Sequence, residues 1–286
     1  MASHLEKLMG LLKVDRVDKY LFTGRSPNFP RRVFGGQVLA QSLNAAIRTV
    51  DDQGRMPHSM HAYFLRPGNP KKQIVYEVDP IRDGRSYTTR RVVAKQDGVA
   101  IFSTSVSFHI EEQGFEHQFP MPDVPGPEEL EDDYDYWLKM AEQHPDQFEK
   151  PSGQAFYRRP VIRRDILNPQ PQEPVQNYWF KMLELIGDEP ILHQTALAYI
   201  SDHSLLGAAL LAHPATGRSK DLSMASLDHA LWFHQPFRAD EWLLYHQDSP
   251  TTFGARGFSR GSFYTEDGRL VASAAQESML RIRRTD

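Results

Sequence analysis

The 286-residue chain contains no cysteine. Disulfide bonds, thiolate metal sites and a cysteine nucleophile are therefore excluded, and the composition fits a reducing compartment. An excess of positive charge is missing as well, since 33 basic residues stand against 37 acidic ones, so we expect no nucleic-acid partner. No uninterrupted apolar run approaches the ~20 residues that a membrane-spanning helix needs, so we expect no membrane span.

The sequence also lacks a recognisable targeting signal. The N-terminal segment MASHLEKLMGLLK is interrupted by Glu6, Lys7 and Lys13, which is not typical of a signal peptide. Its apolar residues recur at helical spacing instead, at Leu5, Leu8, Met9 and Leu12. The C-terminal RIRRTD is not a peroxisomal tripeptide. We therefore expect a cytoplasmic protein that begins with an amphipathic helix.

Common catalytic and cofactor motifs are absent. There is no GxSxG elbow, and the glycine pair of FGGQ (34–37) is not followed by the Gly-Lys-Ser/Thr of a phosphate-binding loop. Histidines occur in two pairs, at His58 and His61 and at His229 and His234. On strands, residues three or five apart point to opposite faces, so neither pair can readily share one metal ion. We expect neither a metal nor a cofactor.

The middle of the chain differs from its flanks. Four prolines fall between 120 and 127, followed by the acidic EELEDDYD and the helix-like YWLKMAEQH. Prolines at this density interrupt both sheet and helix. We predict an N-terminal unit at 1–112, a Pro-rich acidic linker at 113–153 and a C-terminal unit at 154–286.

The two flanks resemble each other. HAYFLRP (61–67) aligns with ALWFHQP (230–236), YEVD (76–79) with YHQD (245–248), and QDGVAIFSTS (96–105) with EDGRLVASAA (266–275). Several matches in one order and at nearly constant spacing indicate a duplicated unit. Each copy begins with a small-residue helix, in GGQVLAQSLNAAIRTV and in LHQTALAYISD, followed by strand-like segments that Asp-Gly turns separate. This pattern predicts an α+β fold in which an antiparallel sheet surrounds each helix.

Two polar residues interrupt apolar patterns in the second half. Asp202 ends the run TALAYISDH (195–203), and burying a carboxylate is costly unless it is hydrogen-bonded or has chemistry to do. Gln276 shares one face of a predicted strand with Ala272 and Ala274. In the repeat alignment Gln276 corresponds to Val106 and Asp202 roughly to Ala45. The polar groups are therefore expected in the C-terminal unit alone.

Several long segments carry a family resemblance. VFGGQVLAQSLNAA, HSMHAYFLRPG, RDGRSYTTRRV, ASLDHALWFHQPF, ARGFSRGSFYTEDGRLVAS and AAQESMLR together resemble the type II acyl-CoA thioesterases, which are double hot-dog proteins. The resemblance covers nearly the whole chain except the Pro-rich linker. It implies two antiparallel sheets, each wrapped around a central helix, and hydrolysis of fatty acyl-CoA to free fatty acid and coenzyme A.

The resemblance also implies a catalytic set. The family's acid at the end of the second central helix matches Asp202, its hydroxyl residue before an Asp-His pair matches Ser226, and its glutamine on the last strand matches Gln276. Close relatives commonly have Thr at the hydroxyl position, and Ser keeps the hydroxyl but loses a methyl group that restricts the rotamer.

The chemistry of these groups suggests attack by water. Asp202 can accept a proton from water that Ser226 and Gln276 hold, with backbone N–H groups near a helix start as oxyanion donors. Asp202 as a direct nucleophile remains an alternative, as does His58 or His229 as the general base. A different function also stays open, that of an acyl-CoA-binding or dehydratase-type hot-dog protein, because His203 follows Asp202 directly.

The sequence gives only general indications of how the substrate and further copies of the chain bind. Arginines in GRSYTTRR and GARGFSR can contact the phosphates of coenzyme A, and no single one stands out. Edge strands and exposed aromatic residues such as Tyr264 favour further association. We expect a homodimer or homotetramer with acyl-CoA as its substrate.

Overall fold

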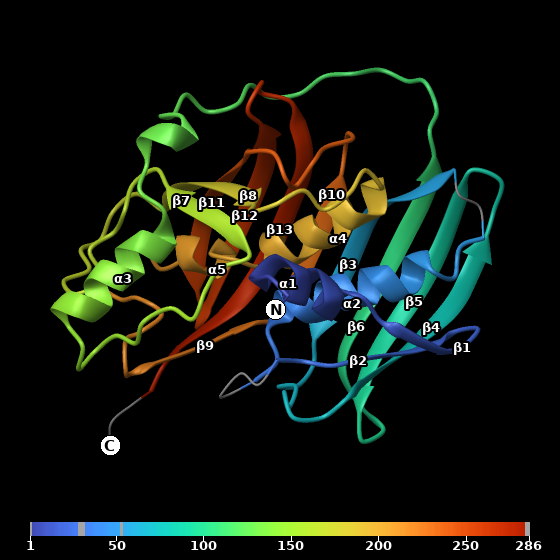
Figure 1. The fold of residues 1–286 in the computed structure, drawn as a ribbon, viewed down its shortest axis with the longest axis horizontal. Helices are drawn as coiled ribbons and strands as arrows, with labels where there is room; N and C mark the ends of the chain where they lie inside the picture. Colours follow the sequence, from blue (N-terminus) through green and yellow to red (C-terminus); the bar gives the residue numbers. More distant parts are fainter. Residues whose placement is uncertain (1, 28–31, 52–53, 284–286) are drawn as a thin grey trace.

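The computed structural model describes residues 2–27, 32–51 and 54–283 (Figure 1). The N-terminal half contains α1 (His4–Leu12), β1 (Asp15–Asp18), β2 (Leu21–Gly24), α2 (Gly35–Ile47), β3 (Arg55–Phe64), β4 (Ile74–Asp83), β5 (Tyr87–Gln96) and β6 (Val99–Ile110). A connecting segment holds the 3-10 turn η1 (Pro127–Glu129) and α3 (Asp133–Gln143).

The C-terminal half repeats this order with additions. It contains β7 (Phe156–Pro160), β8 (Val175–Met182), α4 (Pro190–Ser201), α5 (Leu205–Ala208), β9 (Leu222–Ser226), β10 (Asp228–Phe233), β11 (Leu243–Phe253), β12 (Arg256–Thr265) and β13 (Leu270–Ile282). No helix within the described ranges is long and apolar enough to cross a membrane.

The strands form one continuous antiparallel sheet. Their order is β1-β2-β4-β5-β6-β3 in the first half and β10-β13-β12-β11-β8-β7 in the second, with β9 paired to β13. The second series reverses the first, and the halves meet where β3 pairs with β10, for example His61 opposite Ala230. The predicted double hot-dog architecture is confirmed, and its two sheets are joined edge to edge.

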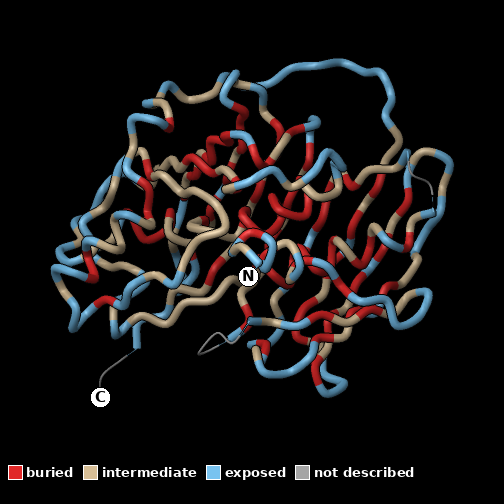
Figure 2. Tube along the Cα trace, viewed as in Figure 1, coloured by how far each residue is buried: buried red, intermediate tan, exposed pale blue. Residues whose placement is uncertain are grey.

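The two central helices are α2 and α4, as the small-residue segments predict. They lie side by side against the sheet (Figure 1), and every residue of α4 from His193 to its end at Ser201 is buried (Figure 2). A helix that is apolar around its circumference is stable only when it is surrounded. At Gly36 an added Cβ would lie 2.4 Å from the backbone oxygen of Tyr199, so the glycine lets the helices approach closely.

Local signals in the sequence have clear counterparts. Helix α1 begins with a capping box between Ser3 and Glu6 and buries Leu5, Leu8 and Leu12. The β5–β6 hairpin turns at Asp97 and Gly98, with φ angles of 49° and 78°. Positive φ at both central residues is what a two-residue type I′ turn requires, and Asp-Gly supplies it at low cost.

The connecting segment covers part of the C-terminal half. It arches over the molecule from β6 and then descends to α3 beside β7 (Figure 1). The indole N–H of Trp179 donates to Pro125 O (3.0 Å), and that of Trp242 donates to Glu128 Oε1 (3.1 Å). Beneath the segment Tyr264 is only 4% exposed. The expectation that Tyr264 is an exposed aromatic was wrong, because the path of the connecting segment decides its burial.

Candidate active site

A cavity of about 690 Å³ opens between the two halves. The N-terminal half contributes the start of α2, the end of β3 and residues of β6. The C-terminal half contributes the end of α4 and the segment from Met224 to Leu227. Its walls are mainly apolar, with Val38, Phe64 and Phe102 among them. Asp202 and Ser226 both line this space.

Asp202 bridges the two central helices. It is the C-cap residue of α4, and its Oδ2 accepts a hydrogen bond from the backbone N–H of Gly36 in the first turn of α2 (2.9 Å). An added Cβ at Gly35 would lie 2.6 Å from this oxygen, so the Gly35–Gly36 pair makes room for the carboxylate. The start of a helix also favours negative charge, because its first N–H groups point outward.

Ser226 and Gln276 lie next to this carboxylate. Ser226 Oγ is 3.4 Å from Asp202 Oδ1, a long hydrogen bond, and accepts one from Gln276 Nε2 (3.0 Å). Gln276 also donates to Ser278 Oγ (3.1 Å). Gln276 is 0% exposed and lies behind Ser226, not in the wall of the cavity. The structure thus brings the three predicted site residues together.

His229 extends the network on the far side of Gln276. Its Nδ1 lies 2.7 Å from Gln276 Oε1, and its Nε2 lies 2.9 Å from the hydroxyl of Ser201. Because the amide N–H groups of Gln276 donate to two serines, its Oε1 must accept, so the proton of His229 is on Nδ1. Nε2 then carries no proton and faces the Ser201 hydroxyl, which is also within hydrogen-bond distance of Ala198 O (3.0 Å). Donated hydrogen bonds therefore run from His229 through Gln276 and Ser226 toward Asp202.

The surroundings of His229 make its ring a weak base. The side chain is 0% exposed, and burial lowers its pKa to about 4, so the ring is neutral at pH 7 with both nitrogens engaged. His58 is hydrogen-bonded to Ser107 Oγ (2.8 Å) and packs against Tyr87 and His109. Sequence reasoning missed the contact between His229 and Gln276, although their strand alternation directs both side chains to the same buried face.

The pKa of Asp202 is shifted into the neutral range. Burial raises its pKa from 3.8 to about 7, against the opposing effects of the hydrogen bonds from Gly36 and Ser226 and of the Arg32 charge. A carboxylate with a pKa near 7 can both accept and return a proton at physiological pH.

His203 lies beside Asp202 in a different environment. Its ring sits among Phe34, Phe156 and Tyr199, with centroid separations of 4.7, 5.1 and 5.2 Å. Burial lowers its pKa to about 3, so the ring is neutral. Within the described residues, its Nε2 has no hydrogen-bond partner. The adjacent acid and histidine therefore differ in environment, and the histidine belongs to the aromatic wall of the cavity.

The corresponding groups are apolar in the N-terminal half. Val106 and Ala45, aligned with Gln276 and Asp202, are both 0% exposed. Helix α4 also begins differently from α2, because Pro190 occupies its first turn and has no N–H to donate. Among residues 2–27, 32–51 and 54–283, no group of three or more His, Asp and Glu side chains could hold a metal ion.

The fold and this site define a double hot-dog protein with a half-buried acid between its halves. The same fold occurs in a conserved hot-dog protein from Alicyclobacillus acidocaldarius, at 19% identity and a TM-score of 0.74 over 96% of this chain and 97% of that one. A much closer structure is that of an acyl-CoA thioesterase II from Mycobacterium marinum. It is 39% identical with a TM-score of 0.80, over 96% of this chain and 98% of that one.

Sequence comparisons agree. Residues 149–279 match the family described as acyl-CoA thioesterase, and residues 23–109 match the acyl-CoA thioesterase N-terminal domain. Acyl-CoA thioesterase 2 of Haemophilus influenzae is 37% identical over 98% of this chain and 99% of its own length. Acyl-coenzyme A thioesterase 8 of Mus musculus is 38% identical over 96% of this chain and 88% of its own. The chain belongs to the acyl-CoA thioesterase family.

The raised pKa of Asp202 predicts how its replacement changes stability with pH. The folded chain binds this proton more tightly than the unfolded chain, where the pKa returns to about 3.8. The stability contributed by the protonated form is therefore complete below pH about 4 and is lost as the pH rises through about 7. Asp202→Asn does not titrate, so its melting temperature relative to wild type should increase from pH 5 to pH 8. A difference that stays constant over this range in thermal unfolding would contradict the burial of the charge.

Proposed function

We propose that this protein hydrolyses fatty acyl-CoA thioesters to free fatty acid and coenzyme A. The observation that carries the proposal is the Asp202 carboxylate, which ends in an apolar cavity between two hot-dog halves with a pKa near 7 and Ser226 beside it. The family membership supports the same reaction. The cavity walls suit an acyl chain, since they bury apolar surface.

In the proposed mechanism Asp202 acts as the general base. Its carboxylate takes a proton from water, and the oxygen of that water attacks the thioester carbonyl carbon. Gly35, the first residue of α2, lines the cavity, and its N–H is among the four that a helix leaves without internal partners. We assign this N–H to the developing oxyanion. When the C–S bond breaks, the proton on Asp202 passes to the departing thiolate.

The hydrogen-bond network orients the base and the water. Gln276 fixes the Ser226 hydroxyl, which leaves Ser226 able to orient either Asp202 or the water. Attack by Asp202 itself would give a mixed anhydride and is the second mechanism. Single-turnover hydrolysis in ¹⁸O-labelled water, followed by mass analysis of the enzyme, tests for the anhydride. A general base delivers the label to the product acid alone, whereas label in the Asp202 carboxylate would show an anhydride that water opens at the Asp202 carbonyl carbon.

Asp202→Asn should lose most of the turnover while staying folded, because the amide keeps the shape but cannot accept the proton. We expect a fall of at least ~10³-fold, and about 10²-fold for Ser226→Ala and for Gln276→Ala, which position the reacting groups. The double variant of Ser226 and Gln276 should lose much less than the product of the single losses, because the two act as one unit. The measurement is thiol release from a long-chain acyl-CoA.

Val106→Ala is the matched control for these variants, since it changes the equivalent position of the other half. It should lower stability and leave the rate almost unchanged. A near-wild-type single-turnover rate for folded Asp202→Asn would remove Asp202 from the mechanism.

The charges of the cavity suggest where coenzyme A binds. Its charged lining residues are Asp202, Arg32 and Arg66, and both arginines are exposed at the surface. They donate to the backbone oxygens of Met224 and Ala100 (2.9 Å each). Phosphates are too costly to bury unpaired, so they stay at the surface while the thioester reaches Asp202. We propose that Arg32 and Arg66 contact the phosphates of coenzyme A.

Four of the five arginines in the segments GRSYTTRR and GARGFSR form ion pairs elsewhere. In the ion pairs of the structure Arg90 joins Asp83, Arg91 joins Asp79, Arg256 joins Glu277 and Arg260 joins Asp248. Each pair joins an arginine to a carboxylate on a neighbouring strand, which supports a structural use of these four side chains.

Arg32→Ala and Arg66→Ala should each raise the KM for acyl-CoA about 5- to 10-fold, with little change in kcat, since binding charges at a rim act before the chemistry. The KM for an acyl-N-acetylcysteamine ester, which has no phosphate, should stay the same. Arg91→Ala is the control, because Arg91 is exposed and paired with Asp79. Equal losses for both substrates would show that the arginines support the shape of the cavity instead.

We further propose the sequence-based division into units at 1–112 and 154–286, joined by 113–153, and a cytoplasmic location.

We also propose a homodimer or homotetramer, since β1 and β7 end the strand order and leave edges that can pair. Light scattering at assay concentrations should give two or four times the chain mass of 32.8 kDa. A particle of the single-chain mass would contradict this proposal.

A further inference from the structure

The turn after Asp202 has an unusual backbone. Ser204, which lies between Asp202 and α5, has φ 63° and ψ −16°, in the left-handed region. Residues other than glycine reach this region at a cost, and such strain persists only where the surroundings hold it. The residue that carries the strain is two positions from the proposed general base.

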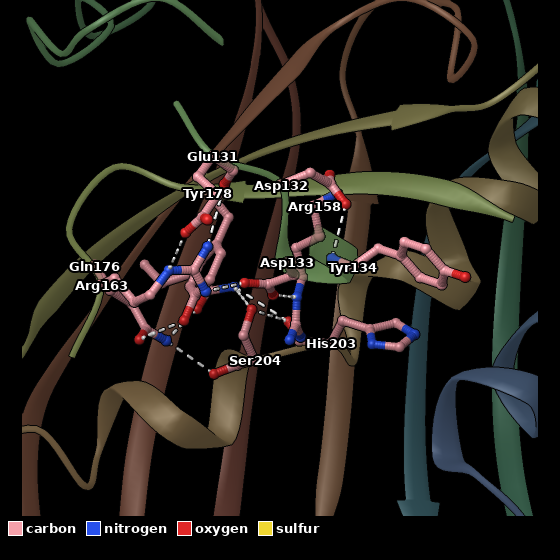
Figure 3. Close-up of polar contacts among 11 residues, drawn as sticks. Glu131, Asp132, Asp133, Tyr134, Arg158, Arg163, Gln176, Tyr178, His203 and Ser204 are labelled. Carbon is pink, nitrogen blue, oxygen red and sulfur yellow. Dashed lines mark hydrogen bonds and ion pairs between the residues drawn. The ribbon is translucent and has the colours of Figure 1, made fainter. Parts of the chain in front are cut away.

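Side chains of the sheet hold this turn. At the end of α4, Tyr245 OH donates to Ser201 O (2.8 Å). Gln247 Nε2 donates hydrogen bonds to His203 O (3.3 Å) and to Ser204 Oγ (3.1 Å). Gln176 Nε2 donates to Ser204 O (2.9 Å), a contact drawn in Figure 3. The last carbonyls of a helix have no internal partners, and here the sheet supplies them.

The two glutamines form one unit. Gln247 on β11 lies directly opposite Gln176 on β8, and Gln247 Oε1 accepts a hydrogen bond from Gln176 Nε2 (2.6 Å). Gln247 is 0% exposed, so its amide forms hydrogen bonds to Gln176 and to the turn and none to solvent. We call Gln176 and Gln247 the amide clamp.

The N-terminal half has the same fold but no glutamine at the position equivalent to Gln247. In the repeat alignment Tyr245 corresponds to Tyr76, and Gln247 corresponds to Val78. Both tyrosines are buried and their hydroxyls are hydrogen-bonded, whereas a buried valine replaces the amide. A hot-dog half therefore tolerates Val at this position, and the amide occurs in the half that carries Asp202.

We propose that Gln247 and Gln176 are positioning residues that hold the Asp202–Ser204 turn in its left-handed shape and so direct the Asp202 carboxylate toward Gly36 N–H and Ser226. This inference rests on the proposed function, in which Asp202 is the base. Neither glutamine lines the cavity that holds Asp202. Their effect passes through the backbone carbonyls of His203 and Ser204 and through the Ser204 hydroxyl.

The test is Gln247→Val, which installs the residue that the other half already uses. We expect kcat for a long-chain acyl-CoA to fall about 10-fold while KM stays within about 2-fold, because binding surfaces are intact and only the base is displaced. Adding Ser204→Gly should restore kcat at least 3-fold, since glycine adopts the left-handed conformation without strain.

The control is Gln96→Val. Gln96 is a buried glutamine that also donates to backbone carbonyls, those of Asn69 (2.8 Å) and Lys72 (3.0 Å), in the other half. It should lower stability and leave kcat unchanged. If Gln247→Val does not fold, Gln176→Met tests the same contact at the partly exposed end of the clamp, with the same expected loss and the same rescue.

An unchanged kcat in the folded clamp variant would overturn the proposal, as would a lost kcat that Ser204→Gly does not restore. These outcomes are separable from failure of the proposed function. If Asp202→Asn is inactive while Gln247→Val is fully active, the role of Asp202 as the base is supported and the role of the amide clamp is contradicted. If Asp202→Asn is active, both proposals are contradicted.

Discussion

The close approach of α4 to the first turn of α2 sets the position of the Asp202 carboxylate between the two halves. Gly36 admits the Tyr199 carbonyl, and Gly35 admits the Asp202 carboxylate, each at a distance that a Cβ would prevent. A carboxylate from one half of the duplicated chain can then accept a hydrogen bond from Gly36 of the other half. Neither half contains the complete arrangement, because Asp202 and the helix start that donates to it belong to different halves of the chain.

The surroundings of Asp202 keep its proton exchange separate from that of nearby groups. Burial raises the pKa of Asp202 and lowers that of His203 and His229, so the two rings stay neutral where the acid is half ionised. The ordered donors of His229, Gln276 and Ser226 add no charge of their own. Of Asp202, His203 and His229, only Asp202 therefore has a pKa near neutral pH.

The sequence predicted what local pattern and resemblance can determine. The small-residue segments gave α2 and α4, Asp-Gly gave the turn at Asp97, and the resemblance named Asp202, Ser226 and Gln276, which the structure places together. Their catalytic roles stay predictions. Strand alternation placed Gln276 on a buried face, but the pattern alone gave no partner for it.

Contacts between distant segments could not be predicted in this way. The hydrogen bond from Gly36 to Asp202 joins residues 166 positions apart and depends on how two helices pack. The burial of Tyr264 depends on the path of the connecting segment, which its prolines do not specify. The proton of His229 is placed by its neighbours, so a histidine that looks like a base in the sequence is a neutral hydrogen-bond donor in the fold.

The junction between β3 and β10 has a consequence for synthesis on the ribosome. In the finished sheet β3 lies between β6 and β10, with neighbours on both sides. Its partner β10 is translated long after the N-terminal strands, which can already pair with one another. Until then β3 is an open edge and α2 lacks the cover of α4, so the nascent chain exposes both a strand edge and apolar surface. Early intermediates of this protein should therefore be more prone to association than the completed chain, and a chaperone that shields this edge would act before residue 228 emerges.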